Sequence, residues 1–220
     1  MSIGNAIWMY GSSARGNEDH LSDIDVLLVG PGGRSSAAAL SGAFEGGSVA
    51  VSQYSWPEIR HMASYGSLFL HHVRLEGRVL NEEPCCEGEL RHILDGLGEY
   101  TRARKDVAAF TTVLADVRES LAHGDVVTYE LGVLATVLRH AAILGCWLIG
   151  DPRFGRVAPV EHYARARGLD RCAFDGFLEL YKYRLYLDRR ADQRDLAPVC
   201  IQGWLGRAEC LVASLGELAG

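Results

Sequence analysis

Residues 10–29 restrict the fold and the chemistry of this chain more than any other stretch. An apolar segment ends at Gly11 and Ser12, a polar stretch follows, and an Asp-Ile-Asp segment at 23–25 leads directly into four apolar residues. This pattern predicts a strand, a turn of small residues, a loop, and a second strand that begins with two acids. Side chains two residues apart in an extended chain point the same way, so Asp23 and Asp25 can share a hard divalent cation.

The turn before the two acids has residue types that bind phosphate. Gly11 lets the backbone approach a ligand closely. The Ser12 hydroxyl, the neighbouring backbone N–H groups and the Arg15 guanidinium can bind phosphate oxygens. A phosphate site that faces two carboxylates holding Mg²⁺ or Mn²⁺ indicates phosphoryl or nucleotidyl transfer.

These residues resemble the signature of the polymerase-β-like nucleotidyltransferases, and most closely that of their small, minimal branch. The resemblance covers about residues 4–80 and rests on Gly11-Ser12, Ala14-Arg15-Gly16 and Ser22-Asp23-Ile24-Asp25. It implies that Asp23 and Asp25 are the catalytic, metal-binding acids. It also implies that Gly11, Ser12, Arg15 and Ser22 contact the nucleotide and its phosphates.

The resemblance further implies that the enzyme transfers a nucleoside monophosphate, expected to be AMP, from a nucleoside triphosphate to a hydroxyl group. A small molecule such as an aminoglycoside, a protein side chain and an RNA end are all compatible acceptors. RNA is less favoured because residues 88–220 carry 17 Lys and Arg against 18 Asp and Glu. Such a balance lacks the basic excess of a general nucleic-acid binder.

The expected third strand, residues 48–54, lacks the third carboxylate that active members of this family usually carry. Val49 and Val51 would face one side, and Ser48, Ala50, Ser52 and Tyr54 the other, with Ser52 expected at the place of the missing acid. Three interpretations remain open. Glu76 or an acid of the helical half supplies the function, or two acids suffice, or the protein binds nucleotide without turnover. In the last case it is a degenerate nucleotidyltransferase that acts as a nucleotide-binding or antitoxin-like partner protein.

The period of the apolar residues divides the chain into two parts. Strands are expected at 6–10, 24–29, 48–54 and 78–80, with helices at 35–44, 55–65 and 67–75. A Pro- and Gly-containing linker follows, and the pattern is then helical to the end. The expected fold class is α/β, in an α+β arrangement: a small mixed sheet at 1–84 and an all-α bundle at 88–220, which selects the acceptor or a partner.

Three further groups of polar residues are candidates for a functional role. Glu76 is either a solvated acid or part of the site. His71 and His72 are adjacent on a helix and point about 100° apart, so they cannot easily share one ion; one packed and one exposed ring is expected. Arg139 lies inside an apolar helix, where a guanidinium needs an acid from another helix or a phosphate-bearing ligand as partner.

Arg118 and His123 have the spacing found in a family of helical RNases that often accompany minimal nucleotidyltransferases. The alternative is that both cations lie at a helix C-terminus, where the helix dipole favours them. With 20 Arg and 8 His residues in the chain, such spacings also arise by chance.

The remaining features predict a cytoplasmic protein. The six cysteines include no Cys-x-x-Cys pair, which indicates reduced thiols. No signal peptide is expected because the first strand begins almost at Met1. The most apolar window, residues 131–149, has Arg139 and His140 at its centre, so a buried helix is expected rather than a membrane span. A homodimer or a complex with a partner protein is compatible with the sequence.

Overall fold

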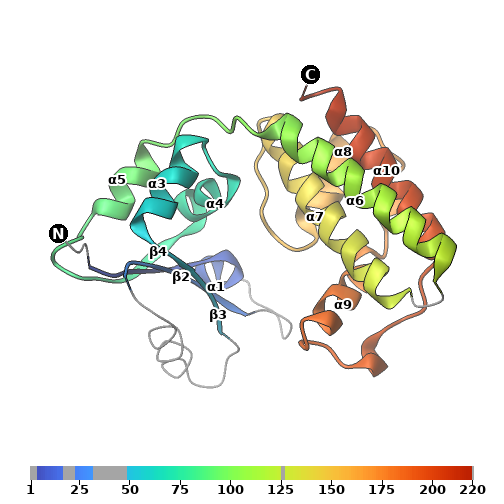
Figure 1. Ribbon diagram of the computed structural model, residues 1–220, viewed down its shortest axis with the longest axis horizontal. Coiled ribbons are helices and arrows are strands. Elements are labelled where there is room, and N and C mark those ends of the chain that lie inside the picture. The colour runs from blue at the N-terminus through green and yellow to red at the C-terminus, as the bar shows by residue number, and fades with distance from the viewer. Residues whose placement is uncertain (1–3, 17–22, 32–48, 125–126, 220) are drawn as a thin grey trace. The chain divides into compact units, whose positions relative to one another are not determined.

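The computed structural model describes residues 4–16, 23–31, 49–124 and 127–219, and the side chains of Arg171 and Cys172 are not described. The chain forms two compact units, residues 1–101 and 102–220 (Figure 1). The helix expected at residues 35–44 lies outside the described part of the chain.

The first unit is built on a four-stranded mixed sheet with the order β3-β2-β1-β4. Its strands are β1 (Ala6–Tyr10), β2 (Ile24–Val29), β3 (Val49–Tyr54) and β4 (Arg78–Glu82). β1 pairs antiparallel with β2 and with β4, whereas β2 and β3 are parallel. The register places Asp25 beside Tyr10 on one side and beside Ala50 on the other.

Four helices complete the described part of this unit. They are α1 (Gly11–Arg15), α3 (Trp56–Ser64), α4 (Leu68–Glu76) and α5 (Glu89–Asp95). Ser55 caps α3, and Glu58 bonds back to the Ser55 backbone in a capping box, which fixes where that helix begins. The residues after Gly11 were expected to form a loop, but they form one helical turn. Gly16, with φ of 70°, ends this turn in the left-handed conformation.

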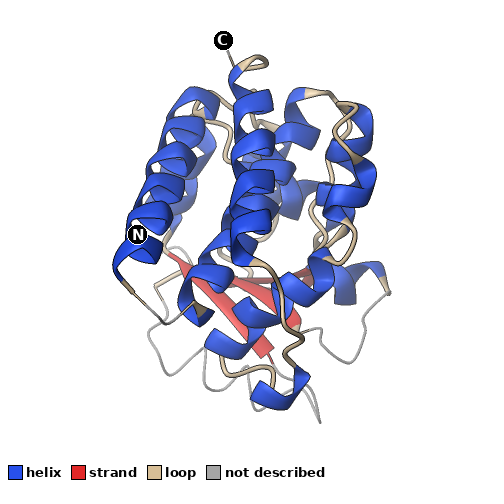
Figure 2. Cartoon of the chain, turned by 90° about the vertical axis from the view of Figure 1, so that its right-hand side faces the viewer, coloured by secondary structure: helices blue, strands red, loops and turns tan. Residues whose placement is uncertain are grey.

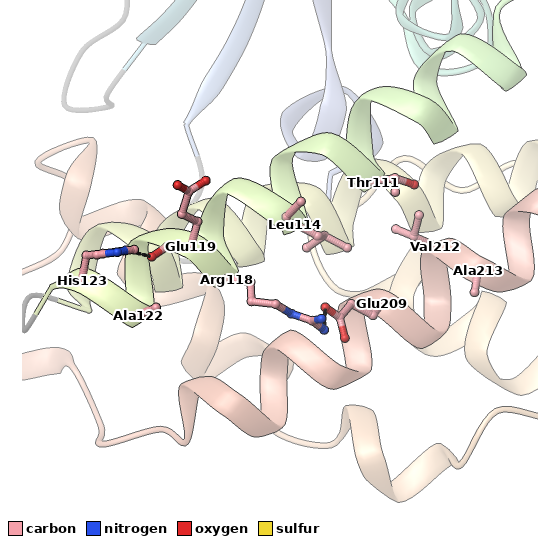
Figure 3. Close-up of a pocket in the computed structure, with 10 residues that line it drawn as sticks. Thr111, Leu114, Arg118, Glu119, Ala122, His123, Glu209, Val212 and Ala213 are labelled. Carbon is pink, nitrogen blue, oxygen red and sulfur yellow. Dashed lines mark hydrogen bonds and ion pairs between the residues drawn. The ribbon is translucent and has the colours of Figure 1, made fainter.

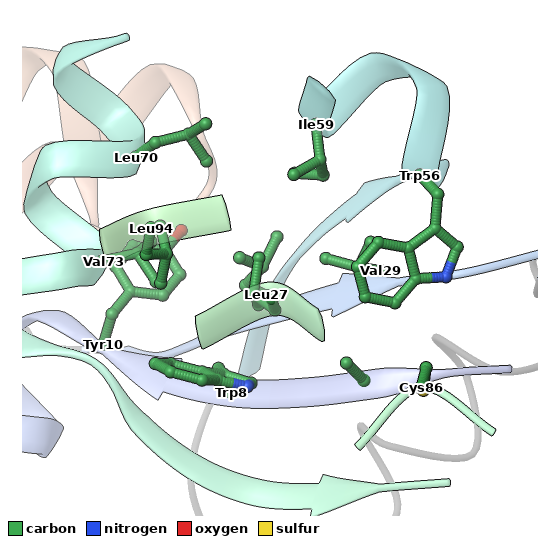
Figure 4. Packing of buried hydrophobic residues seen from close by; sticks show 12 residues of the cluster. Trp8, Tyr10, Leu27, Val29, Trp56, Ile59, Leu70, Val73, Cys86 and Leu94 are labelled. Carbon is green, nitrogen blue, oxygen red and sulfur yellow. The ribbon is translucent and has the colours of Figure 1, made fainter. Parts of the chain in front are cut away.

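The core of the first unit lies between the sheet and α3, α4 and α5 (Figure 4). Alternate residues of β1 and β2 face these helices, and Trp8 and Leu27 are fully buried. Trp8 Nε1 donates to Glu82 and Trp56 Nε1 to the Gly4 carbonyl, so both buried indole N–H groups are satisfied.

Helix α5 belongs to the first unit by its packing, although the sequence placed residues 88–101 in the helical half. Leu90 and Leu94 are fully buried in the same core as Trp8. The change in composition at residues 84–88 therefore lies within the first unit, and the division between the units falls after Thr101.

The second unit contains helices and no strand among its described residues (Figure 2). Its elements are α6 (Ala103–His123), α7 (Thr128–Leu148), α8 (Ala158–Ala166), η1 (Arg171–Phe174), α9 (Phe177–Leu187), η2 (Gln193–Asp195) and α10 (Ile201–Gly216). α7 is central and packs against α6, α8, α9 and α10. A small mixed sheet followed by a helical bundle confirms the predicted fold class.

Helix α7 is long and apolar enough to cross a membrane, but 67% of its most apolar window is buried inside the structure. Gly145 shows how closely it is packed, because a Cβ there would come within 2.5 Å of the Tyr163 ring of α8. α7 is thus the mostly buried core helix of the bundle.

Candidate nucleotide and metal site

The carboxylate of Asp25 lies against the backbone of Gly11. A Cβ added at Gly11 would be 2.6 Å from Asp25 Oδ2, and Gly11 has φ of 75°, a conformation that favours glycine. This contact joins the end of β1 and the start of α1 to Asp25, the second residue of β2. The sequence predicted that a small-residue turn and two acids belong to one site, and the structure brings Gly11 and Asp25 together.

Asp23 lies one residue before β2 and is 9% exposed. Its backbone carbonyl accepts a hydrogen bond from Ser13 Oγ at 3.3 Å, so α1 contacts both acid-bearing residues. Ser12 is half-buried in the first turn of α1. Ser22, which the sequence assigned to the phosphate site, lies outside the described residues.

The residue of β3 paired with Asp25 is Ala50, and Ser52, expected at the place of the missing acid, lies two residues further along the same face. Ser52 pairs with Leu27, and its hydroxyl shares a hydrogen bond of 3.0 Å with the hydroxyl of Tyr10. Paired residues of neighbouring strands present their side chains on the same face. The position beside Asp25 on β3 therefore carries a methyl group.

Glu76, a candidate for the missing acid, is in contact with two cationic side chains. Its Oε2 forms an ion pair with Arg15 Nη1 and accepts a hydrogen bond of 2.8 Å from His72 Nε2. Partial burial would raise the pKa of Glu76, but His72 and Arg15 together outweigh it and lower that pKa below its ordinary value. Glu76 is therefore an anion at neutral pH.

Among the described residues, no three His, Cys, Asp or Glu side chains lie close enough together to hold a metal ion. Asp23 and Asp25 provide two hard oxygen donors. This donor set suits Mg²⁺, which proteins usually hold through one or two carboxylates together with phosphate oxygens and water. A third protein ligand is not required for such a fit.

Arg139 is held by the backbone of the loop that follows α7. Its Nη2 donates to the Phe154 carbonyl at 3.0 Å and its Nε to the Gly155 carbonyl at 3.3 Å. Its place inside an apolar helix predicted an acid or a phosphate-bearing ligand as its partner. In the structure, two backbone carbonyls accept hydrogen bonds from this half-buried guanidinium.

Arg118 and His123, which have the spacing of the helical RNases, make separate contacts beside a groove of about 530 Å³ between α6 and α10 (Figure 3). Arg118 reaches across to α10 and forms an ion pair with Glu209. His123 Nδ1 donates to the Glu119 carbonyl of its own helix at 2.9 Å. The two side chains thus have different partners, and only His123 lies in the last turn of α6, where the helix dipole favours a cation.

His72 is a residue of the site region that sequence reasoning missed. Of the two adjacent histidines, one ring was expected to be packed and the other exposed. Both are shielded from solvent: His71 is 2% exposed and the His72 side chain 12%. The His72 ring packs edge-on against Tyr10, with ring centroids 5.3 Å apart. The spacing of His72 and Glu76, four residues on a helix, was the signal that could have revealed this pair.

One family model matches the part of the chain that carries Gly11, Asp23 and Asp25. Residues 2–66 match the family model of the nucleotidyltransferase domain, which covers β1, α1, β2, β3 and α3. No curated protein matches the chain. This match is consistent with a polymerase-β-like nucleotidyltransferase, and the helical second unit fits that type. The domain supports nucleotidyl transfer as the general chemistry of the protein.

Proposed function

We propose that the protein is a Mg²⁺-dependent nucleotidyltransferase that moves AMP from ATP to a hydroxyl group. The observation that carries this proposal is the contact between the Asp25 carboxylate and Gly11, within a segment that matches the nucleotidyltransferase domain. This contact brings an acid of the metal-binding pair beside the turn that would receive the triphosphate.

Asp23 and Asp25 would hold Mg²⁺ or Mn²⁺, and the backbone at Gly11 with Ser12, Arg15 and Ser22 would hold the phosphates. The bound cation supplies charge neutralisation and helps to orient the α-phosphate for attack. The site residues align the triphosphate so that the acceptor oxygen can form a bond to the α-phosphorus while pyrophosphate leaves.

The acceptor is a small molecule such as an aminoglycoside, or a protein side chain, and the helical second unit would select it. The acidic net charge of −6 disfavours nucleic acid. We assign the protein to the cytoplasm because its most apolar helix is largely buried and its described cysteines are unpaired thiols. It would act as a homodimer or with a partner protein.

The alternative is a non-catalytic protein that binds nucleotide or acts as an antitoxin-like partner. Ala50 favours this function, because the strand position in register with Asp25 carries no acid. The contacts of Glu76 with Arg15 and His72 favour it as well, since they engage the other candidate acid.

The test is incubation of the full chain with α-³²P-labelled ATP, Mg²⁺ and three acceptors: aminoglycosides, the protein itself and an RNA oligonucleotide. We expect label transfer by the wild type that stops with EDTA and in an Asp23→Asn/Asp25→Asn variant. Asp95→Asn, at the end of α5, is the matched control for loss of an acid. Transfer that survives the double substitution would refute the metal assignment. Nucleotide binding without transfer to any acceptor would favour the non-catalytic alternative.

A further inference from the structure

Arg15, His72 and Glu76 form a cluster that connects α4 to the end of α1. The Glu76 carboxylate contacts the guanidinium of Arg15 and the imidazole of His72 through the same oxygen, Oε2. His72 and Glu76 are one turn apart on α4, so the helix itself sets their spacing. Arg15 is the last residue of α1 and lies 61 residues before Glu76 in the sequence.

The cluster is shielded from solvent more than ordinary surface ion pairs are. The side chains are 12% exposed for His72, 18% for Glu76 and 31% for Arg15. By comparison, Arg60 and Glu89, another ion pair of the first unit, are 46% and 36% exposed. An ion pair screened less by water orients its partners more strongly.

A second contact fixes the cluster to the sheet. The His72 ring packs edge-on against Tyr10, with an interplanar angle of 89°, and Tyr10 directly precedes Gly11. The Tyr10 hydroxyl is in turn bonded to Ser52 of β3. His72 therefore links α4 to the end of β1, beside the backbone that contacts Asp25.

We propose that Glu76 and His72 are positioning residues that hold the Arg15 guanidinium beside the Gly11-Ser12 turn, ready to bind the β- or γ-phosphate of the nucleotide. The inference rests on the proposed function. A guanidinium has five N–H donors and one carboxylate accepts from at most two of them, so contact with Glu76 is compatible with contact to a phosphate. A fixed Arg15 avoids the entropy cost of ordering a long side chain on binding.

This inference gives Glu76 a role different from that of a third metal ligand. A metal ligand would act on the reacting centre, whereas a positioning residue acts through Arg15. The two roles differ in a measurable way. Loss of a positioning residue weakens binding of the triphosphate end only, and it has no additional effect once Arg15 is absent.

The experiment measures binding of ATP with Mg²⁺, AMP with Mg²⁺, and inorganic tripolyphosphate to the full chain by titration calorimetry. The variants are Arg15→Ala, Glu76→Gln, His72→Phe, His72→Gln and Arg15→Ala/Glu76→Gln. His72→Phe keeps the ring against Tyr10 but removes the donor to Glu76, and His72→Gln keeps a donor. Glu89→Gln is the matched control, because its carboxylate forms the more exposed ion pair with Arg60.

We expect Glu76→Gln and His72→Phe to raise the Kd for ATP and tripolyphosphate about ten-fold, as Arg15→Ala does, and to leave the Kd for AMP unchanged. Ten-fold corresponds to about 1.4 kcal/mol. The double variant should bind ATP no more weakly than Arg15→Ala alone. His72→Gln and Glu89→Gln should stay close to the wild type.

Several results would overturn the inference. Tighter ATP binding by Glu76→Gln would mean that Glu76 competes with phosphate for Arg15. Equal losses of ATP and AMP affinity would indicate general structural damage. If Arg15→Ala weakens ATP binding while Glu76→Gln and His72→Phe do not, the positioning role fails and the proposed function stands. If the wild type binds neither ATP nor tripolyphosphate, both fail.

Discussion

The carboxylate of Asp25 occupies the space that a side chain at residue 11 would need. A Cβ on Gly11 would lie 2.6 Å from Asp25 Oδ2, closer than non-bonded atoms can approach. The backbone at Gly11 also has φ of 75°, a region that L side chains rarely adopt. Glycine is thus required here both by conformation and by the acid that packs against it.

Replacement of Gly11 by Ala should displace Asp25 and weaken metal-dependent nucleotide binding. The left-handed backbone alone should cost about 1–2 kcal/mol of stability. The displacement of Asp25 adds to this cost and affects binding directly. Urea denaturation and titration with ATP in the presence of Mg²⁺ would measure the two effects.

Gly88→Ala separates the two contributions. Gly88 has φ of 74°, and no atom lies within 4 Å of a Cβ added there. It should show the conformational cost without a change in nucleotide affinity. Equal effects of both substitutions on binding would mean that Asp25 does not depend on Gly11.

Glu76 should make the stability of the first unit depend on acid pH. His72 and Arg15 lower its pKa in the folded state despite partial burial, so the stabilisation is complete above the ordinary value of 4.5. It is lost as the pH falls through the lower, folded-state pKa. We therefore expect the wild type to lose more stability than Glu76→Gln between about pH 5 and pH 3.

Chemical denaturation at several pH values would measure this difference. Glu89→Gln again provides the control, because its ion pair with Arg60 is more exposed. Parallel pH profiles for the wild type and Glu76→Gln would show that the cluster contributes no linked protonation.

Much of the fold follows from local sequence signals. Residues 6–10 and 26–29 are continuous apolar runs of strand length, and all four residues at 26–29 are buried in β2. Ser55, Pro57 and Glu58 specify the start of α3 through contacts within four residues. Gly11 and Asp25 could be assigned to one site because their spacing belongs to a known signature.

The remaining details depend on contacts between residues distant in sequence. The register of β3 against β2 pairs Ala50 with Asp25, and no local pattern fixes parallel register. The apolar spacing of Leu90 and Leu94 predicts a helix of the bundle, but in the structure these residues of α5 pack in the same core as Trp8 of the sheet. Arg139 donates to two backbone carbonyls, and the sequence alone cannot predict which carbonyls accept such hydrogen bonds.

Arg139 should prove to be a structural residue of the second unit. Arg139→Met removes both donors to the carbonyls of Phe154 and Gly155 and leaves them less satisfied, so we expect a loss of about 1–3 kcal/mol of stability. Arg165→Met, an exposed position on α8, is the control and should have little effect. ATP affinity should not change in either variant. A selective loss of ATP affinity in Arg139→Met would place this residue in a ligand site.

The cysteines should differ sharply in reactivity. Burial raises the pKa of Cys146 to about 12, so almost none of its thiol is ionised at pH 8. Cys200 and Cys210 are exposed. Iodoacetamide should therefore modify these two residues in the native protein and leave Cys146 intact until the chain unfolds, as peptide mass spectrometry would show. Early modification of Cys146 would mean that α7 is not stably buried.

A carboxylate placed at residue 50 should complete a metal site if Asp25 is a metal ligand. Ala50 and Asp25 are paired across parallel strands, which lie about 4.8 Å apart, so Ala50→Asp places a second acid beside Asp25. Without metal the two like charges should repel each other and lower the melting temperature. Mg²⁺ or Mn²⁺ should reverse this loss and raise the melting temperature more than in the wild type. Gln53→Asp introduces the same charge on the opposite face of β3 and should show no such rescue. If the two variants respond alike to Mg²⁺, the assignment of Asp25 to a metal site is wrong.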